Sequence, residues 1–159
     1  MGTGKSYWGR RWASFYQLPF FETDDMVEAM AGMPVSRIFE EKGEVFFREI
    51  ERRVLESLEK EGPGIISTGG GMPCFGDNMD RMNAAGITIF LDAEPALLAE
   101  RLSKAKKKRP LLNNITPDEL IPFITERLSE RIAYYRNAAY TFSVTDLRDD
   151  SLDDLPGLG

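Results

Sequence analysis

A short segment rich in glycine, near the start of the chain, has the clearest chemical meaning. Gly2-Thr3-Gly4-Lys5-Ser6 match the end of the pattern G-x-x-x-x-G-K-[ST]. In that pattern, backbone amides at a helix N-terminus surround a chain of phosphates, the lysine reaches the outer phosphates, and the hydroxyl binds Mg²⁺. A helix predicted over residues 7–17 gives the required context. The segment therefore indicates a nucleotide site with Ser6 as a metal ligand, and the alternative is a solvent-exposed loop that matches by chance.

Two carboxylates follow a short apolar run at residues 18–21, which is predicted to be a strand. Glu22 and Asp24 lie on the same side of an extended segment, because side chains alternate along a strand. Beside a lysine and bound Mg²⁺, one carboxylate could hold the water shell of the metal, and the other could accept a proton from an attacking hydroxyl. The alternative is that Asp24 or Asp25 only caps the next helix.

Arg48 and Glu51 are three residues apart in the clearest predicted helix, residues 44–60, and share one face of it. Such a pair is either a surface ion pair or an arrangement in which Glu51 orients Arg48 to bind a substrate carboxylate. Gly69-Gly70-Gly71 come directly after a predicted buried strand at residues 65–67. Without side chains, a ligand can approach the backbone amides closely, and the alternative is a flexible turn.

Further basic residues lie in the second half of the chain. Arg109 lies in a lysine-rich segment, residues 103–114. This segment is predicted to be a mobile lid that supplies a cation to the transferred phosphate. The lysines around it are interpreted as solvated. Arg136 comes at the end of a predicted helix, where it could bind substrate or merely offset the helix dipole.

Composition restricts the chemistry further. The chain has 159 residues, a net charge of −6 and 42% hydrophobic residues, which predicts one globular domain over residues 1–159 and no general nucleic-acid surface. It contains no histidine, so acid–base work falls to carboxylates, lysine or tyrosine. A lone cysteine, Cys74, and the lack of a long apolar run predict a cytoplasmic protein without a membrane span.

Strands and helices alternate along the chain, which predicts an α/β fold of three layers, α/β/α, with a parallel sheet. In the helix at residues 44–60, the apolar stripe is predicted to comprise Val45, Phe46, Ile50, Val54, Leu55 and Leu58. Ligands of such sheets bind beyond the carboxyl ends of the strands. The phosphate loop, Glu22 with Asp24, the three glycines and the turn after Leu91 all come at such ends, so we expect them to share one cleft.

Taken together, these residues resemble shikimate kinases, which are P-loop enzymes that phosphorylate the 3-hydroxyl of shikimate and share the architecture of nucleoside-monophosphate kinases. The resemblance covers nearly the whole chain, and the order and spacing of its segments are specific. The segments are Gly2-Thr3-Gly4-Lys5-Ser6, Phe21-Glu22-Thr23-Asp24, Ile38-Phe39 through Gly43-Glu44, Phe47-Arg48-Glu49-Ile50-Glu51, Thr68-Gly69-Gly70-Gly71, Arg109-Pro110-Leu111-Leu112 and Arg131–Arg136.

The resemblance implies ATP and Mg²⁺ as cofactors, shikimate as substrate, and a monomeric enzyme. It implies that Gly2, Thr3, Gly4, Lys5, Ser6, Arg101 and Arg109 bind the nucleotide, with Arg101 packing on adenine and Arg109 in the lid. Ser6 and Glu22 would serve the metal. Shikimate would be held by Asp24, Arg48, Gly69, Gly70, Gly71 and Arg136. The implied catalytic residues are Lys5, Asp24 and Arg109, with Asp24 near the reacting hydroxyl.

The chain departs from the family pattern in three places. Glu22 replaces the first aspartate of Asp-x-Asp and is one methylene longer. Residues 151–159 contain Pro156 where the family carries a closing helix. The apolar strand that launches the phosphate loop is absent, and burying its roughly five apolar residues would contribute about 7–15 kcal/mol. We therefore expect the 159-residue chain to be poorly stable and weakly active, and about nine upstream residues to restore both.

Two other functions stay open at this stage. One is another small-metabolite kinase of the same architecture, such as a gluconate kinase. Arg48, the three glycines and Arg136 argue against it, because they suit a carboxylated cyclic polyol. The other is a non-catalytic protein that binds a nucleotide or shikimate, which Glu22 and the incomplete phosphate loop make plausible.

Overall fold

The computed structural model describes residues 2–104 and 115–156 of the chain. The described residues form seven α-helices, one 3₁₀ turn and four short strands. The helices are α1 (Lys5–Phe15), α2 (Thr23–Ala31), α3 (Val35–Glu41), α4 (Gly43–Leu58), α5 (Asn78–Ala85), α6 (Pro95–Lys104) and α7 (Pro117–Tyr135), with a 3₁₀ turn, η1, at Met72–Cys74. The strands are β1 (Phe20–Glu22), β2 (Ile65–Ser67), β3 (Ile89–Asp92) and β4 (Tyr140–Ser143).

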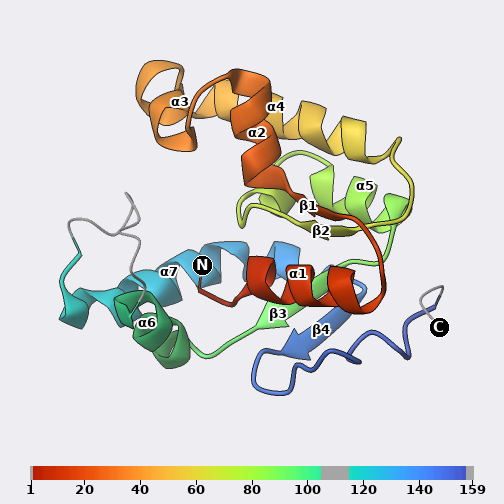
Figure 1. The fold of residues 1–159 in the computed structure, drawn as a ribbon. Coiled ribbons are helices and arrows are strands. Elements are labelled where there is room, and N and C mark those ends of the chain that lie inside the picture. The colour runs from red at the N-terminus through yellow and green to blue at the C-terminus, as the bar shows by residue number, and fades with distance from the viewer. Residues whose placement is uncertain (1, 105–114, 157–159) are drawn as a thin grey trace.

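All strand pairing among the described residues is parallel, as the alternation of strands and helices predicts. β1 pairs with β2 and β3 pairs with β4, in two separate two-stranded sheets. Figure 1 shows α2, α3 and α4 on one side of β1 and β2, and α1 close to both pairs of strands. The arrangement is an α/β fold with helices on both faces of parallel strands.

A cavity of about 690 Å³ lies between the two strand pairs. Residues of β2 and β3 line it, together with apolar side chains of α1 and α4 such as Trp12 and Leu55. Because β2 and β3 are not hydrogen-bonded to one another, the interior is divided into separate apolar clusters rather than one continuous core. The expectation that about nine residues before the phosphate loop would raise the stability and activity of the chain stays a prediction.

Helix α4 supplies most of the apolar contacts in the layer of α2, α3 and α4 that lies on one side of β1 and β2. Its buried residues are Phe47, Ile50, Glu51, Val54, Leu55 and Leu58, which pack with Val27 of α2 and Ile38 of α3. The predicted stripe was wrong at its first position, because Val45 is 76% exposed and Phe47 takes its place in the core. The helix therefore turns a slightly different face inward than its apolar pattern suggests.

Glycine allows α1 to approach β1 closely. A Cβ atom on Gly9, in the middle of the helix, would lie 2.6 Å from the ring of Phe20. A side chain there would push the helix away from the strand. Since α1 also carries Lys5 and Ser6 at its start, this contact fixes the phosphate loop relative to the end of β1.

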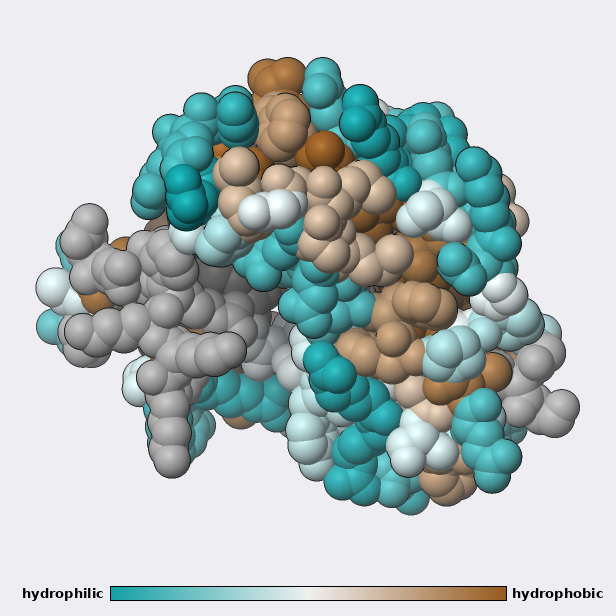
Figure 2. Space-filling view, turned by 45° about the horizontal axis from the view of Figure 1, so that its top comes forward, coloured by the Kyte–Doolittle hydropathy of each residue, from teal (hydrophilic) through white to brown (hydrophobic). Residues whose placement is uncertain are grey.

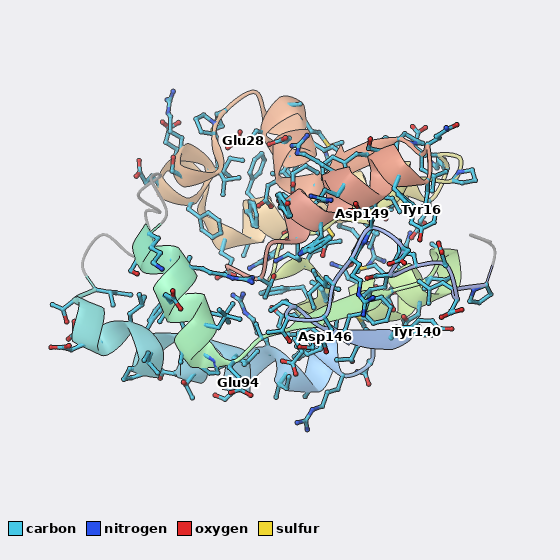
Figure 3. The ribbon with its side chains drawn as sticks, turned by 60° about the horizontal axis from the view of Figure 1, so that its bottom comes forward. Tyr16, Glu28, Glu94, Tyr140, Asp146 and Asp149 are labelled. Atoms are coloured by element: carbon cyan, nitrogen blue, oxygen red, sulfur yellow. The ribbon has the colours of Figure 1, made fainter. Side chains whose placement is uncertain are left out.

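Residues 144–156 form turns that pack against α1 rather than a closing helix. Arg11 donates two hydrogen bonds to Asp149, and the indole of Trp12 donates to the Arg148 carbonyl at 2.8 Å. Figure 3 shows Tyr16 beside the segment that carries Asp149, and its hydroxyl donates to Asp153 at 2.7 Å. The turns therefore anchor α1 in the way that a terminal helix would. Among the described residues, no helix has both the length and the apolar character of a membrane span.

Leu152 is 1% exposed and fills the space between these turns and Trp12. We expect Leu152→Ala to lower the free energy of unfolding by about 2–5 kcal/mol, because it removes buried methyl groups and leaves a cavity. Chemical denaturation measures the change. Val45→Ala is the control, since Val45 is exposed and its truncation should change stability by less than about 0.5 kcal/mol. Equal effects of the two substitutions would contradict the packing role of the turns.

Candidate active site

The phosphate loop has a backbone that only glycine adopts easily. Gly2 and Gly4 have φ angles of 74° and 88°, and Gly4 is the N-cap residue of α1. No acidic residue lies in the first turn of α1, so its N-terminal amides can face an anion. The hydroxyl of Thr3 is buried without a hydrogen-bond partner among the described residues. The helix N-terminus and the unpaired hydroxyl of Thr3 at this place fit the binding of a phosphate group.

Arg101 on α6 contacts this loop. Its Nη1 donates to the Thr3 carbonyl at 3.2 Å, and Gly2 lies against Leu102 of the same helix. Helix α6 therefore borders the phosphate loop, and the packing of Arg101 on adenine stays a prediction. Arg109 lies outside the described residues, so its predicted lid role stays a prediction.

Asp24 lies in the first turn of α2, not in an extended segment. The expectation of a strand through Asp24 was wrong, because α2 begins at Thr23 and Glu22 is its N-cap residue. The capping alternative also fails, since Asp24 is past the N-cap position and Glu22 makes no side-chain cap. The carboxylate instead lies against Gly69, where a Cβ atom would be 2.7 Å from Oδ1.

The charges around Asp24 belong to the predicted site. Asp24 is exposed as a whole residue, but desolvation of its carboxyl raises its pKa. The Glu22 carboxylate raises the pKa further, and the Lys5 ammonium opposes the shift. Lys5 and Glu22 are thus close enough to Asp24 to influence its ionisation. The structure brings the phosphate-loop lysine and both predicted carboxylates together, although they come from three different elements.

The three glycines each lie against a different polar side chain. A Cβ atom on Gly69 would meet Asp24, one on Gly70 would be 3.4 Å from Nη1 of Arg131, and one on Gly71 would be 2.8 Å from both Nη atoms of Arg48. The segment is also held in place, because the Gly69 amide donates to the Thr23 hydroxyl and the Tyr135 hydroxyl donates to the Gly70 carbonyl. It is therefore a fixed floor between charged groups and not a flexible turn.

Arg48 and Glu51 form a buried pair, so the surface-pair alternative is wrong. Glu51 is 1% exposed and its Oε2 accepts a hydrogen bond from Nη1 of Arg48 at 2.5 Å. Burial raises the pKa of Glu51, and the Arg48 guanidinium opposes that shift. The Nε and Nη2 atoms of Arg48 donate to Glu44. These contacts fix the guanidinium beside Gly71. Among the described residues, they leave two of its five N–H donors for a ligand.

Arg131 is a residue of the site that the sequence reasoning missed. It lies on α7 next to Gly70, and its charge affects the pKa of Glu51, Cys74 and Tyr135. Arg136, to which the sequence assigned a substrate role, is an exposed residue at the C-cap of α7. A usable signal was the spacing of Arg131 and Tyr135, which are four residues apart and so share a helix face.

Cys74 lies at the edge of this group, with Sγ 4.0 Å from the Gly70 carbonyl oxygen. Burial raises the pKa of its thiol, so it is less reactive than an exposed cysteine. Within the described ranges, no cluster of three or more acidic or cysteine side chains could hold a metal by itself. A magnesium ion bound here would need water or phosphate oxygens as further ligands, and the roles of Ser6 and Glu22 stay a prediction.

Arranged in this way, the residues can hold a phosphate group beside an alcohol that carries a carboxylate. The α1 N-terminus and Lys5 can take phosphate, Asp24 can accept a proton, and Arg48 with Arg131 can bind a carboxylate over the glycine floor. On the face seen in Figure 2, apolar side chains reach the surface in a patch that polar side chains surround.

Comparison with known proteins agrees with this chemistry. The sequence profile described as shikimate kinase matches residues 1–153. A shikimate kinase of Bacteroides fragilis is 41% identical over 151 residues, which are 95% of this chain and 84% of that protein. One of Phocaeicola vulgatus is 43% identical over 149 residues, covering 94% of this chain and 85% of that protein.

Solved structures give the same result for the fold. The crystal structure of shikimate kinase from Bacteroides thetaiotaomicron has a TM-score of 0.88 and 41% identity, covering 94% of this chain and 85% of that one. The shikimate kinase of Acinetobacter baumannii in complex with shikimate has a TM-score of 0.79 and 31% identity, covering 94% of this chain and 81% of that one.

Proposed function

The chain belongs to the shikimate kinase family, and on that premise we propose that it transfers the terminal phosphate of ATP to the 3-hydroxyl of shikimate. One observation carries the proposal. Asp24, Arg48 and Arg131 lie against three successive glycines, and Asp24 is within electrostatic reach of the phosphate-loop lysine. A group that can accept a proton, a pair of cations that can bind a carboxylate, and a phosphate site therefore lie in one place.

The residues divide the work between them. The amides at the start of α1 and Lys5 hold the phosphates and offset the negative charge that develops during transfer. Arg48 and Arg131 bind the shikimate carboxylate and so orient the ring. The 3-hydroxyl oxygen then attacks the terminal phosphorus, the bond from phosphorus to the ADP oxygen breaks, and Asp24 accepts the hydroxyl proton. Ser6 and Glu22 would hold magnesium, which would supply further positive charge at the phosphates.

The raised pKa of Asp24 suits this role. A carboxylate whose pKa lies nearer to neutrality is a better proton acceptor than one at its usual value. Glu51 holds Arg48 in place through the hydrogen bond to Nη1. The glycine floor lets the ring approach Asp24 and Arg48 without a side chain between them, since a Cβ atom on either outer glycine would collide with one of the two groups.

A coupled assay of ADP production tests the function. Purified protein with ATP and Mg²⁺ is assayed with shikimate, gluconate or a nucleoside monophosphate. Of these three acceptors, we expect only shikimate to raise ADP production far above background. Comparable turnover of gluconate or the nucleotide would indicate another small-metabolite kinase. Shikimate binding without turnover would indicate the non-catalytic alternative.

The position of Arg131 leads to a matched prediction. Arg131→Ala should raise the shikimate KM by roughly tenfold or more, because a partly buried cation at the carboxylate site is lost. Arg136→Ala should change it by less than about twofold, as expected for an exposed residue at a helix end. Steady-state kinetics of the two variants measure this. The reverse order of effects would restore Arg136 to the role that the sequence gave it.

Glu22 is tested by restoring the shorter side chain. We expect Glu22→Asp to keep or raise kcat and to shift the Mg²⁺ optimum slightly, because a carboxylate that acts through metal-bound water has positional slack. Magnesium titrations of both proteins at saturating ATP and shikimate measure the effect. A large loss of activity would mean that the site is built around glutamate.

The remaining expectations concern the setting of the enzyme. We propose a monomer that works in the cytoplasm with two small-molecule substrates and no nucleic-acid or membrane partner. The lone cysteine and the net charge of −6 support this.

A further inference from the structure

An aromatic ring covers the guanidinium of Arg48. The centroid of the Phe75 ring lies 3.8 Å from Cζ of Arg48, and the Phe47 ring is 5.0 Å away. Phe47 is in the core, whereas Phe75 is 38% exposed. Burial of its own ring therefore explains Phe47 but does not explain why a phenylalanine stands at position 75.

The backbone that carries Phe75 is held on both sides. The Cys74 amide donates to the Gly71 carbonyl, and the Asn78 amide donates to the Phe75 carbonyl at 3.1 Å. The buried side chain of Asn78 donates to the Met72 carbonyl at 2.9 Å. The ring is thus presented from a fixed turn that begins at the glycine floor, and it is not a side chain on a loose loop.

The hydrogen bonds of Arg48 do not by themselves fix the tilt of its guanidinium plane. Its side chain is 17% exposed, and three of its five N–H donors are used by Glu44 and Glu51 among the described residues. Both Nη atoms lie close to Gly71. Two carboxylates hold the edges of the guanidinium, but a planar group held only at its edges can still tilt. A ring against its face opposes that tilt and shields the charge from water.

We propose that Phe75 is a positioning residue for substrate binding, which fixes the plane of the Arg48 guanidinium so that its remaining donors meet the substrate carboxylate. The proposal rests on the proposed function, in which Arg48 binds that carboxylate. Phe75 acts through Arg48 and need not contact the substrate.

The test is a set of substitutions at position 75 with a matched control. Phe75→Leu keeps an apolar side chain and removes the aromatic face. We expect it to raise the shikimate KM by about 3- to 10-fold, the range of a partly desolvated cation–π contact, with the ATP KM and the melting temperature unchanged. Phe75→Tyr keeps the ring and should restore the wild-type KM. Phe15→Leu removes another exposed ring, on α1, and should have no effect on either KM.

A double-mutant cycle separates positioning from direct contact. In the background of Arg48→Ala, Phe75→Leu should cause no further fall in kcat/KM for shikimate, because the group that it positions is gone. An unchanged KM in Phe75→Leu, failure of Phe75→Tyr to restore it, or an equal loss in both backgrounds would overturn the proposal. Failure of the proposed function is a separate result, since the wild-type protein would then show no shikimate-dependent ADP production.

Discussion

Asp24→Asn is expected to lower kcat for shikimate by roughly 10²- to 10⁴-fold while leaving the ATP KM within a few-fold. An amide has nearly the shape of the carboxylate but cannot accept the hydroxyl proton, and general-base catalysis contributes a factor of this size. Asp24 is also positioned for this task, since it lies at the glycine floor and within reach of the Lys5 charge. Steady-state kinetics with shikimate and ATP varied separately measure both constants.

The pH dependence gives an independent check. Because the pKa of Asp24 is raised, kcat/KM should begin to fall at a pH above the usual range of an aspartate as the pH is lowered. The loss occurs on the acid side because the protonated carboxyl cannot accept a proton. This limb should be missing from the residual activity of Asp24→Asn. Asp25→Asn, at the neighbouring residue, is the control and should keep kcat and the limb, with the limb shifted slightly to lower pH because the Asp25 charge helps to raise the pKa of Asp24. A kcat near the wild-type value in Asp24→Asn would remove Asp24 from the chemistry.

Arg48→Ala is expected to weaken shikimate binding by about 2–5 kcal/mol, which corresponds to a roughly 30- to 5000-fold increase in Kd. The substitution removes a charge that meets the substrate carboxylate and leaves Glu51 buried without its partner. Isothermal titration calorimetry with shikimate measures the Kd directly. The ATP affinity should change little, because Arg48 lies against Gly71, whereas the Lys5 charge acts on Asp24 at Gly69.

Two controls accompany this variant. Arg53→Ala removes an exposed arginine from the same helix and should leave the Kd of shikimate unchanged. Arg48→Lys keeps the positive charge but loses the fork of donors, so it should recover only part of the affinity. A Kd for Arg48→Ala within a few-fold of the wild-type value would show that the Arg48–Glu51 pair serves the stability of α4 and not the substrate.

Local sequence signals determined the elements and their order. The strand at residues 65–67 and the helix at residues 44–60 were predicted close to where β2 and α4 lie, because apolar periodicity and helix-stop residues depend on neighbours within a few positions. The phosphate loop was equally readable, because its glycines must take positive φ angles whatever surrounds them. The family resemblance could be established from such short segments because their order along the chain is itself specific.

Tertiary structure decided how those elements face one another. The helix pattern of α4 placed Val45 in the core, but packing against α2 and α3 selected Phe47. The sequence linked Asp24 to an extended strand, whereas its position is fixed by Gly69, 45 positions further along the chain.

The choice between Arg131 and Arg136 shows the physical reason most clearly. Both residues lie at the C-terminal end of the same predicted helix and carry the same charge, so their local sequence does not distinguish them. Only the rotation of α7 about its axis determines which one faces the glycine floor, and that rotation is fixed by long-range contacts such as the bond from Tyr135 to the Gly70 carbonyl. Residue types and spacing thus determined which chemistry the chain can be expected to perform, whereas helix packing decided which of two equivalent side chains lies at the glycine floor.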